Sequence, residues 1–204
     1  MTLRTPAIND MQSVKDELFT YVWDFKHGDN IMYNFAVLRA LYAARSNFED
    51  QDILNKPITI LLVSVIEAIL IDLLARIDQA TTHLPANVDR ATLDNLKVEI
   101  ESKKRPEKIE DEFGERIFLR RKMYQFNDII VLLKKYELFG PQDDSIYATL
   151  TKFGHLRNRV HIENYHRNFE DREYKVFTSQ RLAELESVLS ELWTKMINDY
   201  KRPW

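Results

Sequence analysis

The longest apolar run in the chain covers residues 57–79 and has the sequence PITILLVSVIEAILIDLLARIDQ. Pro57 suits the first turn of a helix, because the N–H that proline lacks would have no partner there. The run is apolar on nearly every side of such a helix, which is typical of a helix at the centre of a fold or at a subunit interface. We therefore expect a helix over about residues 57–79, surrounded by other helices.

This run is also long enough to span a bilayer between Ile58 and Ile77. It contains Glu67, Asp72 and Arg76, and a charge near the centre of a membrane span costs roughly 2.5–3.5 kcal/mol on insertion scales. The first ten residues lack the apolar segment of a signal peptide. The charges and the N-terminus favour a buried helix of a cytoplasmic bundle over a protein embedded in a membrane.

Composition excludes several classes of protein. The chain has 204 residues, of which 45% are hydrophobic, enough for one domain with a substantial core. Only four glycines and six prolines argue against an architecture of strands and turns, and no glycine-rich phosphate loop is present. The absence of cysteine excludes thiolate catalysis, disulfides and cysteine-based zinc sites. With a formal net charge of −3, a nucleic acid would have to be held by a local basic patch.

Apolar residues spaced three and four apart predict further helices along most of the chain. We expect helices over about residues 10–26, 31–48, 115–138 and 145–162, and a last one that Thr178 caps and that ends near residue 200. Gly28 is expected to end the first of these helices and Gly140-Pro141 to end the third. A shorter helix, capped by Asp89 or Thr92, is expected to hold Leu93, Leu96, Val98 and Ile100.

The predicted fold is a single all-α domain over residues 1–204, a bundle of five or six helices with a charged connector at about residues 101–115. Two basic strings flank this connector, Lys103-Lys104-Arg105 and Arg120-Arg121-Lys122. They could follow an RNA backbone, but neighbouring acids nearly cancel their charge. These acids are Glu107, Glu110, Asp111, Glu112 and Glu115. A solvated connector is therefore the favoured interpretation.

The densest group of reactive side chains lies in residues 153–166, FGHLRNRVHIENYH, which hold three of the five histidines. On a helix, Arg157 and His161 share a face, and Asn158 is adjacent to Arg157. Guanidinium binds phosphate oxygens in a bidentate manner. Imidazole titrates near neutral pH, so it can take a proton from a ribose 2′-OH or return one to the leaving oxygen. This combination suits cleavage of a phosphodiester without a metal or another cofactor.

The run Leu156-Arg157-Asn158-Arg159-Val160-His161 resembles the signature of the HEPN superfamily. The resemblance implies a helical, usually dimeric fold and, in many members, a metal-independent endoribonuclease of toxin–antitoxin, abortive-infection or CRISPR systems. It also implies that Arg157 is the motif arginine, Asn158 the polar residue and His161 the histidine. Two copies would form one composite site across a homodimer, with RNA or a nucleotide as ligand and an antitoxin protein as a further partner.

Three residues separate Arg157 from His161, whereas the family has four to six. Arg159 and His166 form a second fit of allowed spacing, with Val160 at the polar position. Two hypotheses therefore stand. One is an active ribonuclease, and the other is a non-catalytic HEPN-like module for nucleotide binding, dimerisation or protein recognition. A metal site among His155, His161, Glu163 and His166 is disfavoured, because their spacing matches no metal-binding pattern.

Two acids interrupt the apolar run. A buried carboxylate is costly unless it is paired. Asp72 has Arg76 four residues later, and we expect these two to form an ion pair. Glu67 lacks such a neighbour, and we expect it to support the site by pairing with Arg157 or Arg159 and orienting the guanidinium.

Overall fold

The computed structural model describes residues 10–22, 25–79, 88–103, 105–110, 116–122, 125–157 and 173–201. The N-terminal half holds α1 (Met11–Leu18), α2 (Phe25–Arg45), the 3-10 helix η1 (Gln51–Leu54), α3 (Asn55–Gln79) and α4 (Arg90–Lys103). Two strands follow, β1 (Arg105–Glu110) and β2 (Arg116–Lys122). The C-terminal part holds α5 (Phe126–Lys135), α6 (Ser145–Arg157), α7 (Glu173–Val176) and α8 (Ser179–Asp199).

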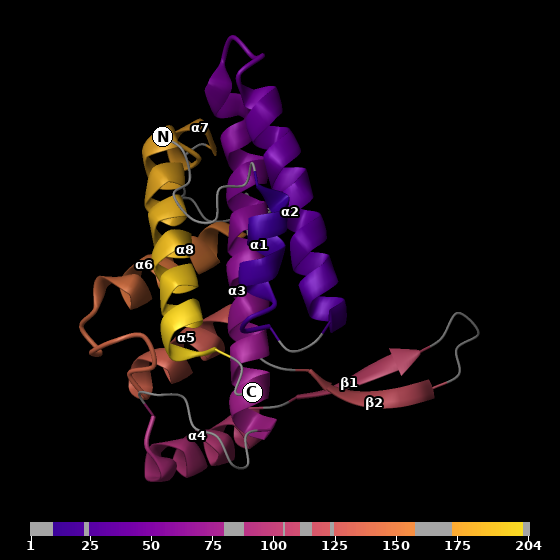
Figure 1. The fold of residues 1–204 in the computed structure, drawn as a ribbon, viewed down its shortest axis with the longest axis vertical. Coiled ribbons are helices and arrows are strands. Elements are labelled where there is room, and N and C mark those ends of the chain that lie inside the picture. Colours follow the sequence, from indigo (N-terminus) through magenta and orange to yellow (C-terminus); the bar gives the residue numbers. More distant parts are fainter. Residues whose placement is uncertain are drawn as a thin grey trace.

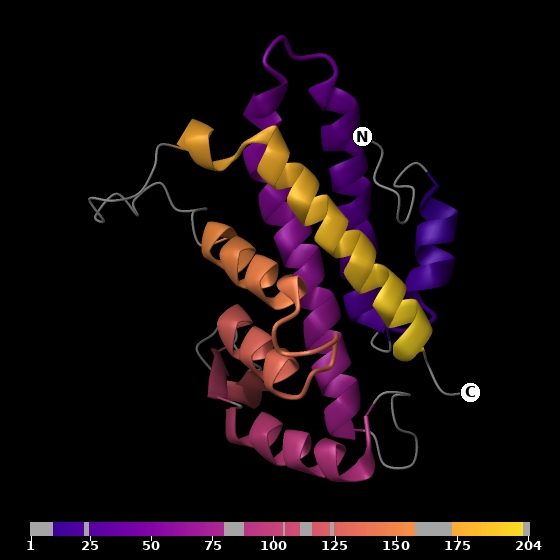
Figure 2. The same cartoon turned by 90° about the vertical axis from the view of Figure 1, so that its left-hand side faces the viewer.

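Helix α3 is the centre of the bundle, as the sequence predicts. It packs against α2, α8, α6, α4 and α5 (Figures 1 and 2). Its buried side chains lie on all sides, and they include the charged residues Glu67, Asp72 and Arg76. By length and composition the segment Gln51–Gln79 could cross a membrane, but 67% of its most apolar window is buried inside the protein.

Helix α8 lies across α3 and closes one side of the bundle (Figure 2). Thr178 caps it as predicted, because its Oγ1 accepts a hydrogen bond from the Arg181 backbone N–H at 3.3 Å. Trp193 is fully buried and meets the rings of Tyr21 and Phe35 edge to face, at centroid distances of 5.4 and 5.5 Å. Apolar residues spaced three and four apart form a stripe along α8 and onto the residue that follows it, and each of them is buried: Leu182, Leu185, Leu189, Leu192, Trp193, Met196 and Tyr200.

The predicted break at Gly28 is wrong. Helix α1 ends at Leu18 and α2 begins at Phe25, so Gly28 lies inside the first turn of α2. A Cβ added at Gly28 would be 2.7 Å from Cε1 of Phe19. Because Gly28 has no side chain, the Phe19 ring can lie close to α2. The local sequence does not indicate this tertiary contact.

The prediction of a helix that begins at Glu115 is also wrong for the residues before Phe126. Helix α4 continues to Lys103, β1 and β2 then form an antiparallel pair, and α5 begins only at Phe126. The stretch expected to be a solvated connector thus contains β1, and the first part of the predicted helix is β2. The two strands form a ribbon that projects away from the helices (Figure 1). Strands need a partner for their hydrogen bonds, and here the partner is a segment further along the chain.

The all-α expectation is confirmed for the bundle, to which this ribbon is added. The described residues form eight α-helices, of which the eight-residue α1 and the four-residue α7 are short, so the expected count of five or six is not confirmed. Asp89 caps α4 through a 2.7 Å hydrogen bond from the Thr92 N–H, which also lowers the pKa of the Asp89 carboxyl. Of the four apolar residues expected in this helix, Leu93, Leu96 and Ile100 are buried, and Val98 is 73% exposed on the outer face of α4.

Candidate functional site

The predicted site residues fall in two places. Arg157 is the last residue of α6, and Glu67 lies in α3. The other four, Asn158, Arg159, His161 and His166, lie outside the described residues, as does the predicted continuation of the helix to residue 162. The roles of these four residues remain predictions. The structure shows the helix at whose end the motif begins, α6.

Helix α6 places residue 157 on its packed face. Ile146, Leu150 and Phe153 are buried, and at 100° per residue position 157 shares their direction. His155 lies on the opposite side of the helix and is exposed. Position 157 therefore lies on the side of α6 that packs into the bundle. An ordinary surface arginine would lie on the outer side of the helix.

The end of α6 is held against the start of α5. A Cβ added at Gly154 would be 2.5 Å from Cδ1 of Phe126 and 3.4 Å from Oδ1 of Asn127. Only glycine lets the first turn of α5 lie this close. Gly154 therefore fixes the start of α5 three residues before the motif arginine, a role that the sequence analysis missed.

Glu67 occupies the midpoint of α3 and is 9% exposed. Helix α6 packs beside the middle of α3 (Figure 2). The hypothesis that Glu67 pairs with Arg157 or Arg159 stays a prediction, and the neighbouring positions of the two helices are compatible with it.

Asp72 and Arg76 form the predicted ion pair. The Arg76 Nε donates to Oδ2 of Asp72 at 2.9 Å, and both side chains are nearly inaccessible to solvent. The Arg76 Nη1 also donates to the backbone carbonyl of Tyr200 at 2.8 Å. The pair therefore joins the C-terminal half of α3 to the end of α8, and its role is structural.

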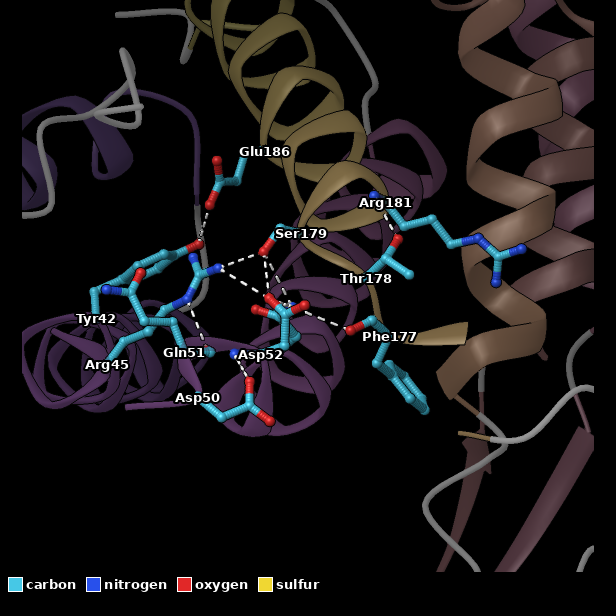
Figure 3. Close-up of polar contacts among 11 residues, drawn as sticks. Tyr42, Arg45, Asp50, Gln51, Asp52, Phe177, Thr178, Ser179, Arg181 and Glu186 are labelled. Carbon is cyan, nitrogen blue, oxygen red and sulfur yellow. Dashed lines mark hydrogen bonds and ion pairs between the residues drawn. The ribbon is translucent and has the colours of Figure 1, made fainter. Parts of the chain in front are cut away.

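A second polar cluster, not predicted from the sequence, joins the end of α2 to the starts of α3 and α8 (Figure 3). Arg45 Nη2 donates to Ser179 Oγ at 2.7 Å, and Ser179 Oγ donates to Asp52 Oδ1 at 2.5 Å. The buried Asn55 donates through Nδ2 to Asp52 Oδ1 at 2.9 Å and to the Phe177 carbonyl at 3.1 Å. Residues 45–55 and residues 177–179 are more than 120 positions apart in the chain, so no local signal could have identified the contacts between them.

Next to this cluster, the Tyr42 hydroxyl donates a short hydrogen bond to the Glu186 carboxylate (Figure 3). Burial raises the pKa of the Glu186 carboxyl, and the hydrogen bond from Tyr42 partly opposes that rise. Burial, followed by the bond to Glu186, raises the pKa of the Tyr42 hydroxyl. The pair links α2 to α8.

The change Tyr42→Phe should raise the pKa of Glu186 further, because it removes the hydrogen bond that stabilises the ionised carboxylate. It should also lower the free energy of unfolding by about 1 kcal/mol. An NMR titration of the Glu186 side-chain carboxyl carbon measures the first effect and urea unfolding the second. A Glu186 pKa that falls or stays constant in the variant would contradict this assignment of the contact.

Neither a metal site within the described residues nor a similar protein indicates the function of this chain. Within the described ranges, no three His, Asp or Glu side chains are grouped so that they could hold a metal ion. No protein-family model, no curated protein and no solved structure matches the chain. Function is therefore inferred from the chain's own residues.

Proposed function

We propose that this chain is a HEPN-like, metal-independent endoribonuclease of a toxin–antitoxin or phage-defence system. It acts in the cytoplasm, outside any membrane, as a homodimer whose two copies of Arg157, Asn158 and His161 line one composite site. The observation that best supports this proposal is the position of residue 157 on the packed face of α6, beside the central helix that carries the buried Glu67. Catalysis requires a phosphate-binding arginine that is held in place, and a packed helix face is a suitable position for such a residue.

The reaction needs only the substrate and side chains of the motif. The ribose O2′ attacks the adjacent phosphorus, the O2′–P bond forms, and the P–O5′ bond breaks. The imidazole of His161 takes the proton from O2′, and His161 of the partner subunit gives a proton to O5′. Arg157 binds the phosphate oxygens, whose negative charge grows in the transition state. Asn158 orients the substrate or the imidazole, and Glu67 orients the arginine.

The test is incubation of the purified full chain with RNA in the presence of EDTA. We expect fragments with 2′,3′-cyclic phosphate and 5′-hydroxyl ends, because the 2′ oxygen is the nucleophile. RNA methylated at each 2′ oxygen is the matched control and should stay intact. Loss of cleavage in EDTA, or products with 5′-phosphate ends, would contradict the proposal.

One alternative has support in the sequence. The short spacing between Arg157 and His161 favours a non-catalytic module that binds a nucleotide or a protein with the same residues. Tight binding of the unmodified RNA without cleavage in the same experiment would favour this alternative.

A further inference from the structure

The ribbon formed by β1 and β2 is the most basic part of the described chain. Its thirteen residues hold six Arg or Lys and two Glu, a net charge of +4, although the whole chain has a formal net charge of −3. Within the described residues, the two strands pair with each other and make no substantial packing contact with a helix (Figure 1). A freestanding basic ribbon contributes little to the core, so its charge needs another explanation.

Strand register separates charges that nearly cancel along the sequence. Arg105 pairs with Lys122 and Pro106 with Arg121 at the base of the ribbon, the end nearest to α4 and α5. Glu110 pairs with Arg116 at the opposite end. The two basic strings, which are separate in the sequence, therefore meet at the base, and the interpretation of a neutral connector is revised.

One face of the ribbon combines this charge with an aromatic residue. Cross-strand partners lie on the same face of an antiparallel pair. The pairs Arg105–Lys122, Glu107–Arg120 and Ile109–Phe118 follow one another along that face. By register, the positions of this face hold three cations, one carboxylate, one isoleucine and one phenylalanine, a net charge of +2. Basic and aromatic residues in such an arrangement match the way proteins hold single-stranded nucleic acid, with phosphates on cations and a base stacked on an aromatic ring.

The base of the ribbon is also close to the motif. Lys122 precedes Phe126 by four residues, which span at most about 14 Å. Phe126 is against Gly154, and Arg157 follows three residues later on α6, a rise of about 4.5 Å. These steps place Lys122 within roughly 25 Å of Arg157, so a strand held on the ribbon can extend to the motif.

We propose that the ribbon is the arm that holds single-stranded RNA for the motif at the end of α6. This inference rests on the proposed function, because it names the substrate of that site. Single strands fit better than duplex RNA, whose major groove is deep, narrow and closed to side chains. Arg105, Arg120 and Lys122 bind successive phosphates, and Phe118 supplies the stacking surface.

The test compares two triple variants that lose the same charge. The ribbon variant is Arg105→Ala, Arg120→Ala and Lys122→Ala. The control variant is Lys15→Ala, Arg39→Ala and Lys201→Ala, three exposed cations outside the ribbon. The probe is a fluorescent, 2′-O-methylated single strand of about 20 nucleotides, longer than common single-strand sites. Because the probe cannot be cleaved, its binding is measured independently of the proposed activity.

We expect the ribbon variant to bind about 100-fold more weakly than the unaltered chain at about 0.1 M salt. The slope of log affinity against log salt should fall by about 2, because each lost phosphate contact on a single strand contributes about 0.7. The control variant should keep both the affinity and the slope. Circular dichroism of both variants checks that the helices are intact.

Three results would overturn the inference: an unchanged affinity in the ribbon variant, an equal loss in both variants, or a loss of self-association in the ribbon variant with RNA binding intact. The last result would make the ribbon a protein-pairing arm. A chain that binds the probe through the ribbon yet leaves unmodified RNA uncut would refute the proposed cleavage and retain the binding arm.

Discussion

Replacing Asp72 with alanine is expected to lower the free energy of unfolding by about 3–5 kcal/mol. The Asp72 carboxylate is 2.9 Å from Arg76 Nε, and the two side chains are 3% and 9% exposed. Without the carboxylate, Arg76 keeps its charge inside the bundle and loses its counter-charge there. The substitution also removes the hydrogen bond from Arg76 Nε to the carboxylate, next to the bond by which Arg76 joins α3 to the Tyr200 carbonyl at the end of α8. Urea unfolding followed by circular dichroism measures the change.

The chain provides a matched control in the pair Arg90–Asp94. It has the same residue types at the same spacing in a helix, but both side chains are more than half exposed and the separation is 3.4 Å. Asp94→Ala should change stability by less than about 0.5 kcal/mol. Equal small effects at the two sites would show that burial of the first pair does not matter.

The variant Asp72→Ala could fail to fold, and the double change Asp72→Leu and Arg76→Met covers that case. Removing both charges eliminates the buried guanidinium that has lost the Asp72 carboxylate, so the double variant should be more stable than Asp72→Ala alone. A double variant that is less stable than the single one would contradict the electrostatic explanation.

The parts of the fold that the sequence predicts correctly depend on local patterns. Helix α3 follows from one long apolar run, and α8 follows from a regular stripe after the capping residue Thr178. Each signal lies within the element that it predicts. The ion pair between Asp72 and Arg76 is local in the same sense, because the two residues are one helical turn apart.

The parts that the sequence does not predict depend on contacts between distant segments. Gly28 looks like a helix end, but its role is set by the Phe19 ring. The hydrogen bonds among Arg45, Asp52 and Ser179 join three separate elements and leave no pattern in the chain. The charge of the ribbon is the clearest case, since only strand register shows that the basic strings meet at one end.

The chemistry of the candidate site stays a prediction from the sequence, and the structure adds the position of the helix on which the motif begins. The sequence indicates the residue types of a phosphodiester-cleaving motif and places its start on a late helix. It does not show that position 157 lies on the packed face of α6, or that Gly154 fixes the helix against α5. Those facts depend on which neighbours α6 meets in the bundle.

Replacing His161 with alanine is expected to slow the cleavage of RNA by at least about 10²–10⁴-fold, the usual contribution of one general acid or base, because the homodimer loses both the proposed base and the proposed acid. The imidazole is the group proposed to take the proton from O2′, and no other side chain of the motif titrates near neutral pH. Single-turnover cleavage of a labelled RNA in EDTA measures the effect. Thermal unfolding of the variant checks that the loss is not a loss of structure.

His155 provides the control for this substitution. It lies six residues earlier, exposed on the side of α6 opposite to position 157, so His155→Ala should cleave at the rate of the unaltered chain. An equal loss in both variants would indicate a general effect of removing imidazole from this segment, and full activity in His161→Ala would remove the histidine from the mechanism. His161→Ala should also bind the 2′-O-methylated strand as tightly as the unaltered chain, because the imidazole moves a proton and the ribbon holds the RNA. Separate loss of cleavage in one variant and of binding in the other would establish that the two surfaces have different roles.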